Sequence, residues 1–107
     1  MNKLLIILSV LALSSIKAFA WDGVATNTIA KVDAPLNGEN YGFRVYLDGL
    51  PSLCGNTQNW AYINKSDDNY DAMVRILLAA HLAGRKVTLY SNRAASGYCH
   101  LGYVTLY

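Results

Sequence analysis

The hydrophobic pattern contains one long helical stretch, at residues 66–84 (SDDNYDAMVRILLAAHLAG). Its larger side chains recur every three or four residues, which places them on one side of a helix. They are Tyr70, Met73, Val74, Leu77, Leu78 and His81. Oxygens of Asp67, Asp68 and Asn69 are suited to cap the first turn, and Gly84 is suited to end the helix in a left-handed conformation. The pattern therefore predicts one helix of about 16 residues.

The other apolar segments are typical of strands. The clearest has Tyr41, Phe43, Val45 and Leu47 on one face. The expected strands cover residues 24–33, 41–48, 60–63, 86–91 and 98–107. The segment 26–28 interrupts the alternation of the first strand, which predicts a bulge or a late strand start there. Residues 35–40 (PLNGEN) are expected to form a turn, with Asn37-Gly38 as its hairpin dipeptide.

The element order predicts a fold that is mainly β with one helix. Three strands, one helix and two strands follow each other, which is the order of a small five-stranded OB-like Greek-key barrel with a capping helix. Closing the sheet would also remove most exposed strand edges. An open antiparallel sheet with the helix on one face is the alternative.

The first 20 residues have the pattern of a signal peptide. Lys3 precedes an apolar run over residues 4–13, and Ala18-Phe19-Ala20 is a small-x-small cleavage site. The run is too short to span a bilayer. We therefore expect residues 1–20 to be removed, residues 21–107 to form one OB-like domain without membrane insertion, and the protein to be secreted or periplasmic.

Removal of the leader also changes the charge. Lys3 and Lys17 leave with it, so that seven basic residues face seven acidic ones in residues 21–107. A neutral chain has no electrostatic footprint for phosphate backbones or anionic lipid. Nucleic acid and membrane surfaces are therefore not expected partners.

The two cysteines, Cys54 and Cys99, are expected to form a disulfide. An even pair in an exported chain is normally oxidised. Closing a loop of about 46 residues would stabilise the fold by roughly 4 kcal/mol in the chain-entropy picture. Two free buried thiols are the alternative. A metal site would need more ligands than the sequence offers, and no cofactor is expected.

No catalytic motif is present in the sequence, so we expect no enzyme activity. His81 lies on the helix stripe and is expected to be a core or interface residue, and His100 is expected to face the surface. Neither a nucleophile elbow nor a phosphate-binding glycine loop occurs. A small hydrolase that uses one of the histidines is the weakest of three hypotheses.

Aromatic side chains favour a binding role. The mature chain would carry eight tyrosines and two tryptophans, whose flat faces and polar tips suit interfaces and stacking on sugars. The alternative is that many of these rings complete a small β core. The outward-facing set is expected to include Tyr46 and Tyr90 and part of Trp21, Trp60, Tyr98, Tyr103 and Tyr107.

Several short motifs resemble the B subunits of subtilase cytotoxin and typhoid toxin and related small exported bacterial OB-fold proteins. They are Trp21-Asp22-Gly23, Cys54, Trp60 and the run from Ala83 to Tyr90 (AGRKVTLY) after the helix. The resemblance implies an OB barrel without enzyme activity that binds cell-surface glycans, assembles as a homo-pentamer and joins a toxin A subunit. It also implies a sugar-binding serine before the first strand, where this chain has Thr26-Asn27-Thr28.

The leading hypothesis is therefore an exported, non-enzymatic binding protein for host glycans. Its predicted ligand-binding residues are Thr26, Asn27, Thr28, Trp60 and Tyr46. The alternative hypothesis is a periplasmic or envelope interaction protein that binds a protein partner and no sugar.

Overall fold

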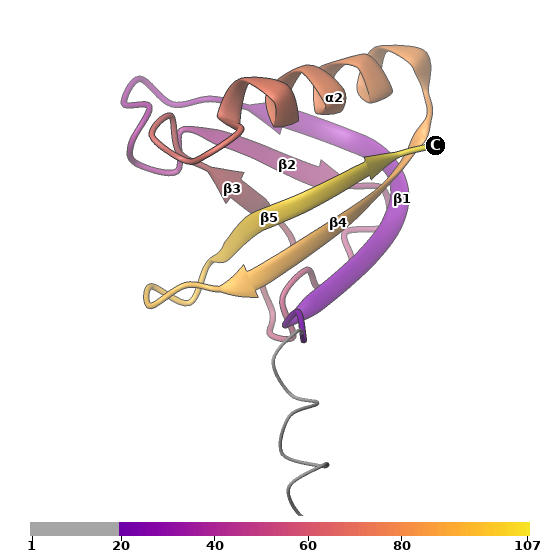
Figure 1. Ribbon diagram of the computed structural model, residues 1–107. Coiled ribbons are helices and arrows are strands. Elements are labelled where there is room, and N and C mark those ends of the chain that lie inside the picture. The colour runs from indigo at the N-terminus through magenta and orange to yellow at the C-terminus, as the bar shows by residue number, and fades with distance from the viewer. Residues whose placement is uncertain (1–19) are drawn as a thin grey trace, which may run out of the picture.

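A computed structural model describes residues 20–107, so the expected signal peptide lies outside the described residues apart from Ala20. Five strands and one helix follow one another in the order β-β-β-α-β-β (Figure 1). They are β1 (Gly23–Asp33), β2 (Phe43–Leu47), β3 (Ala61–Ile63), α2 (Tyr70–Ala83), β4 (Lys86–Arg93) and β5 (Cys99–Leu106). The predicted class, mainly β with a helix between the third and fourth strands, is confirmed. No helix within residues 20–107 is long and apolar enough to cross a membrane.

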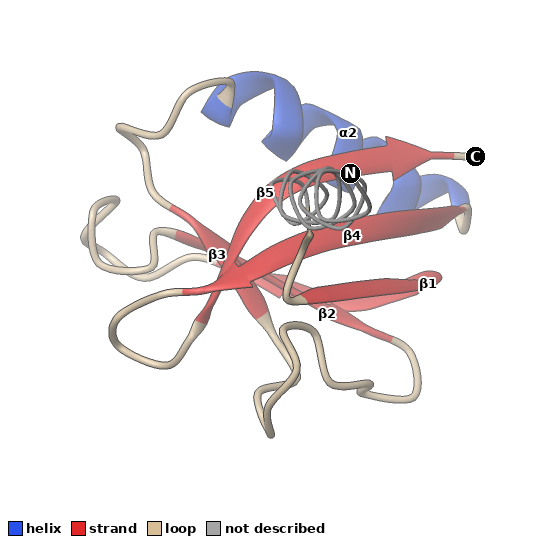
Figure 2. Ribbon diagram, turned by 60° about the horizontal axis from the view of Figure 1, so that its bottom comes forward, coloured by secondary structure: helices blue, strands red, loops and turns tan. Residues whose placement is uncertain are grey.

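The strands form a closed ring in the order β1-β2-β3-β5-β4, with β4 pairing back to β1 (Figure 2). All neighbouring strands are antiparallel except β3 and β5, which are parallel. The ring agrees with the closed OB-like arrangement expected from the sequence and replaces the open-sheet alternative. Its closure leaves no strand at an open edge.

The core fills the inside of this ring. Phe43, Val45 and Leu47 of β2 are buried, as period two predicts for one face of a strand. Val87 and Leu89 of β4 are completely buried. The predicted bulge in β1 exists, but it lies between Ile29 and Lys31 rather than at residues 26–28.

The helix α2 lies across the ring and packs against β1, β4 and β5 (Figure 1). Met73, Leu77 and Ala80 are its buried residues. The prediction that Leu78 belongs to the buried stripe is wrong, because the small Ala80 fits against the sheet while Leu78 faces solvent. Gly84 ends the helix at φ 65°, as predicted, with its N–H donating to carbonyls of the last turn.

The start of α2 differs from the prediction. Asn69 is the N-cap residue at φ 60° and makes no side-chain capping hydrogen bond. Asp67 accepts a hydrogen bond from the Asn64 N–H at 2.8 Å and contacts His100 instead. These side chains therefore organise the loop before the helix more than the helix itself.

Candidate functional site

A row of outward-facing side chains crosses the ring between β1 and β5. Strand register places Asp33 beside Arg44, Arg44 beside Tyr62, and Tyr62 beside His100. The last step depends on the parallel pairing of β3 with β5, which joins segments far apart in the sequence. Each of the strands β1, β2, β3 and β5 thus contributes one polar or aromatic side chain to a single row on the outer surface.

An aromatic cluster covers the middle of this row, and we call it the β3–β5 cluster. It consists of Tyr41, Trp60, Tyr62 and Tyr98. The rings of Trp60 and Tyr98 are 4.8 Å apart, and Tyr41 meets Tyr62 edge-on at 4.7 Å and Tyr98 at 5.1 Å. Tyr62 is nearly buried beneath its neighbours, whereas Trp60 and Tyr98 are half-buried, so part of each ring faces solvent.

The position of Tyr41 requires an unusual backbone. Its φ is 59°, in the left-handed region that a bulky residue rarely adopts. The next residue, Gly42, packs so closely that an added Cβ would lie 2.0 Å from the carbonyl oxygen of Gly38. Tyr41 therefore does not lie on the core face with Phe43, as period two predicted, and its ring reaches the outer cluster instead.

Two loops hold this turn in place. The Gly42 N–H donates to Asn64 Oδ1 at 3.1 Å, and the Lys65 N–H donates to the Gly38 carbonyl at 2.9 Å. The Ser66 hydroxyl donates to Glu39 at 2.6 Å. The β1–β2 loop is thereby fastened to the loop between β3 and α2. The turn predicted at residues 35–40 exists, but as part of this long loop rather than as a tight Asn-Gly hairpin.

Charged groups flank the cluster on both sides. On one side, Arg44 Nε lies 2.9 Å from Asp33 Oδ1, an ion pair without hydrogen-bond alignment, and the guanidinium lies 5.5 Å from the centre of the Trp60 ring. On the other side, His100 Nε2 lies 2.6 Å from Asp67 Oδ2. Arg44 is thus already paired with a carboxylate, and a second carboxylate, Asp67, lies at the opposite side of the cluster.

His100 also stacks on the cluster. Its ring lies 4.9 Å from that of Tyr62 at an angle of 12°. Burial raises the pKa of the Tyr62 hydroxyl above 10.0, and the nearby Tyr41 and Asp67 add to the effect. Tyr62 is therefore a neutral phenol at physiological pH.

The disulfide lies directly beneath these rings. Cys54 and Cys99 are bonded and fully buried, as predicted. Cys99 stands between Tyr98 and His100 in the chain and pairs with Ala61, the residue after Trp60. The bond thus joins the loop before β3 to the first residue of β5, which lies between Tyr98 and His100.

The predicted ligand-binding residues do not gather at one place. Thr26 Oγ1 lies 2.7 Å from Thr88 Oγ1, Asn27 Nδ2 donates to the Asp48 carbonyl at 3.1 Å, and Thr28 Oγ1 donates to the Asp48 carboxylate. The side chains of the segment 26–28 are thus engaged in contacts within the fold. Trp60 lies two strands further round the ring, in the β3–β5 cluster.

Tyr46 also lies outside the cluster. It faces outward on β2, where Lys31 Nζ lies 4.2 Å from the centre of its ring. Conversely, sequence analysis missed Tyr41, Tyr62, Arg44 and His100 as members of a site. The alternation of β2 gave a signal for Arg44, but only the β3–β5 pairing reveals that the other rings meet.

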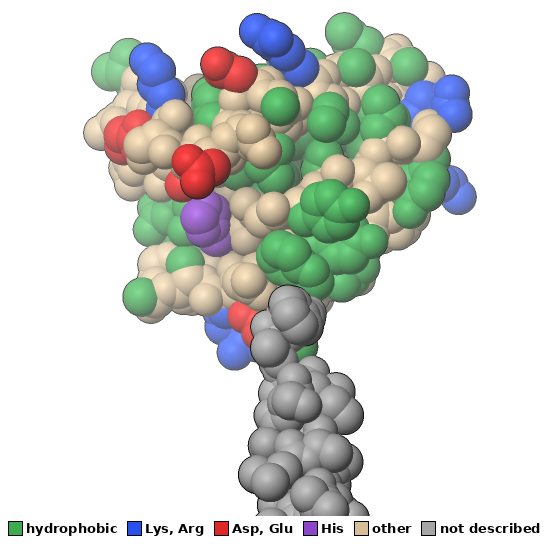
Figure 3. Space-filling view, viewed as in Figure 1, with side chains coloured by type: hydrophobic (Ala, Val, Ile, Leu, Met, Phe, Trp, Pro, Cys, Tyr) green, Lys and Arg blue, Asp and Glu red, His purple; other side chains and the backbone are tan. Residues whose placement is uncertain are grey.

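A second group of rings, which we call the β4–β5 patch, consists of Trp21, Tyr90 and Tyr103. Ring centres are 5.8 Å apart for Trp21 and Tyr90 and 4.7 Å apart for Tyr90 and Tyr103. Exposed Val24 lies beside Tyr90 in the strand register. Figure 3 shows hydrophobic side chains gathered over β4 and β5. Within residues 20–107, no charged side chain packs over these three rings, whereas Arg44 and His100 pack against rings of the β3–β5 cluster.

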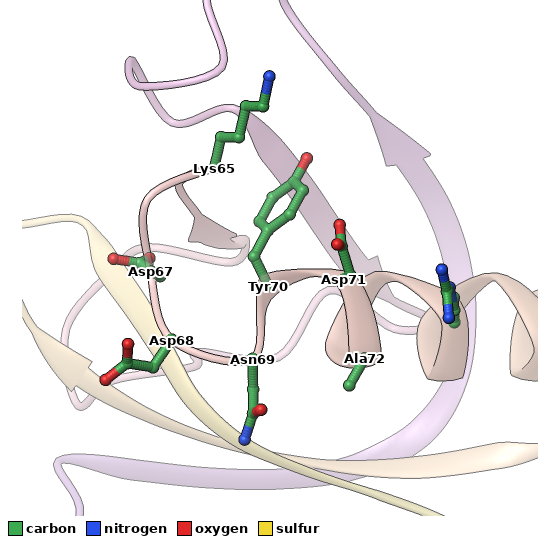
Figure 4. A pocket seen from close by; sticks show the side chains of 8 residues that line it. Lys65, Asp67, Asp68, Asn69, Tyr70, Asp71 and Ala72 are labelled. Carbon is green, nitrogen blue, oxygen red and sulfur yellow. The ribbon is translucent and has the colours of Figure 1, made fainter.

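A surface depression of about 570 Å³ lies at the start of α2. Its lining includes Lys65, Asp67, Asp68, Tyr70 and Asp71. Figure 4 shows these side chains pointing in different directions rather than toward one point. Residues 20–107 contain no group of three His, Cys, Asp or Glu side chains that could hold a metal ion.

A smaller hollow of about 340 Å³ lies between α2 and β5. Met73, Ile76 and Val104 form part of its apolar lining, and Tyr103 joins it to the β4–β5 patch. Comparison with known proteins gives no further guide to either surface. No protein-family model matches the sequence, and no curated protein is significantly similar to it.

Proposed function

We propose that this protein is an exported, non-enzymatic binding protein that holds neutral glycans on the β3–β5 cluster. The observation that carries the proposal is the half-open pair of Trp60 and Tyr98 rings, 4.8 Å apart and surrounded by polar groups. The apolar face of a sugar ring stacks on aromatic faces of this kind, while its hydroxyls need donors and acceptors at the edge. Arg44, His100 and Asp67 supply both.

The charges favour a neutral ligand over an anionic one. Arg44 is paired with Asp33, and Asp67 adds a second carboxylate near His100. An anionic sugar would have to compete with Asp33 for the guanidinium and would meet Asp67 as a like charge. A neutral sugar would keep both pairs intact.

The buried disulfide supports the exported location, because such bonds persist in oxidising compartments. Assembly as a homo-pentamer and association with a toxin A subunit remain predictions that depend on the resemblance to toxin B subunits.

The test is binding of the oxidised protein to an array of neutral and carboxylated glycans. We expect binding to neutral glycans, and a loss of at least about ten-fold in affinity for Trp60→Ala. Trp21→Ala is the matched control, because it removes an indole from the β4–β5 patch instead. Circular dichroism must show that both variants are folded.

Three results would contradict the proposal: no glycan binding at high protein concentration, a preference for carboxylated glycans, or equal losses in the two tryptophan variants. The last result would point to a general loss of structure rather than to a site at Trp60.

A protein partner is the second candidate function. The β4–β5 patch favours it, because Tyr103 and Val24 are each more than half exposed without charged neighbours on the rings. Capture of an envelope protein that Trp21→Ala abolishes and Trp60→Ala preserves would support this function.

A further inference from the structure

The helix α2 has an exposed face that nothing in the described chain covers. Asp71, Arg75, Leu78 and Leu82 follow one another at spacings of four, three and four residues, so they lie on one side of the helix. Leu82 is 86% exposed and Leu78 is 39% exposed. The buried residues of the helix occupy its other side, against the ring. Figure 1 shows α2 on the outside of the molecule, open along its length.

Charge is distributed unevenly along this face. The exposed carboxylate of Asp71 lies in the first turn, after Asp68 in the preceding loop. Arg85 and Lys86 follow the end of the helix, and both are exposed. The face therefore begins with a carboxylate, carries Arg75 and then the two leucines in its middle, and is followed by two basic residues.

We propose that two copies of this protein associate through this face, with their α2 helices antiparallel. A two-fold axis near Leu78 would bring Asp71 of each copy to the region of Arg85 and Lys86 of the other. It would also place Leu82 against the turn that contains Arg75, whose aliphatic stem can cover it. The face is thus complementary to itself, as a two-fold contact requires.

A parallel arrangement of the helices lacks this complementarity. It would place Asp71 against Asp71 and Arg85 against Arg85, and like charges at close range oppose association. The charge pattern therefore favours a two-fold pair over a ring in which the helices run side by side in the same direction. This inference does not depend on the proposed glycan site.

The contact is small. A helix of 14 residues is about 21 Å long, and one such face covers less than the roughly 800 Å² per partner of a standard interface. The pair is therefore a weak, reversible dimer, and its mass must be measured over a wide concentration range.

Analytical ultracentrifugation of the oxidised protein provides the test. We expect a monomer–dimer equilibrium, and Leu82→Lys should raise its dissociation constant by at least about ten-fold. Because Leu82 is exposed in one copy, its replacement leaves the core intact. Leu36→Lys is the matched control, since Leu36 is a fully exposed leucine in the β1–β2 loop and should leave the equilibrium unchanged.

Charge reversal tests the antiparallel direction. Asp71→Lys alone and Arg85→Glu alone should each raise the dissociation constant by about five-fold, and the double variant should restore it. A monomer at all concentrations would overturn the proposal. So would a dimer or larger ring that Leu82→Lys leaves intact, or single charge reversals without effect.

Discussion

The two groups of aromatic rings on this protein have a similar size but a different construction. The β3–β5 cluster has charged side chains at its margins and a disulfide beneath it, and one of its members, Tyr41, has a left-handed backbone conformation. The β4–β5 patch lies on the paired strands β4 and β5, whose register shifts between Tyr90 and Ser91, with Trp21 packed on Gly102. Rings alone therefore do not identify a site. The surrounding polar groups and the strained turn distinguish the first group as the better candidate, since strain of this kind persists only where the surroundings enforce it.

Removal of the disulfide is expected to have the largest effect on the difference between the two groups of rings. Replacing Cys54 and Cys99 by alanine should lower the free energy of unfolding by about 4 kcal/mol, because the bond closes a long loop. Urea denaturation measures this loss.

The same variant should affect the two groups of rings differently. Each group contains one tryptophan, so Trp21→Phe and Trp60→Phe variants report on one group each. We expect the fluorescence of Trp60 to change when the bond is absent and that of Trp21 to stay the same under conditions where the protein is folded. Equal changes at both tryptophans would show that the bond supports the whole ring and not the cluster in particular.

Two glycines give the next largest effect. In Gly42→Ala the new Cβ would meet the backbone of Gly38 at 2.0 Å, and this part of the fold cannot yield without moving Tyr41. We expect a loss of about 2–3 kcal/mol in unfolding free energy. In Gly102→Ala the Cβ would meet the indole of Trp21 at 2.5 Å, and a surface ring can turn away. We expect Gly102→Ala to lower the free energy of unfolding by less than about 1 kcal/mol. Thermal unfolding measures both variants, and equal losses for Gly42→Ala and Gly102→Ala would contradict the contrast.

The smallest effect concerns pH. Because the pKa of Tyr62 is raised in the folded protein, the unfolded chain loses this proton at lower pH than the folded one. The contribution to stability is therefore complete below pH 10 and is lost as pH rises through the folded pKa. Unfolding free energies measured in a series above pH 10 should fall less steeply for Tyr62→Phe than for the unaltered protein. An unchanged slope would place the Tyr62 hydroxyl in solvent.

Local patterns predicted most of the fold. The 3.6-residue period of α2, the two-residue period of β2 and the glycine at position 84 are signals that neighbouring residues carry by themselves. The sequence did not reveal that Ala80 rather than Leu78 lies on the buried side of the helix, because this depends on how closely the helix approaches the sheet. The loop of residues 34–42 was not readable either, since the Asn-Gly pair suggested where the chain turns but not that Tyr41 takes the left-handed conformation.

The candidate site was less predictable than the fold, for a topological reason. Trp60 was identified from its residue type, but its partners come from β3 and from the loops before β2 and before β5. Only the parallel pairing of β3 with β5 places Tyr62 beside His100. A parallel pair joins segments that no hairpin connects, and so leaves no local signal in the sequence.

The parallel seam between β3 and β5 also has a kinetic consequence. The antiparallel β1–β2, β2–β3 and β4–β5 pairs connect consecutive strands, so each can form with little loss of chain entropy. The β3–β5 and β1–β4 pairs join distant segments, so they pay a larger cost of loop closure and are expected to form after the local pairs. Cys54 and Cys99 lie at this seam, so their oxidation would trap the late step of folding. The finished ring would thus depend on thiol oxidation as well as on strand pairing.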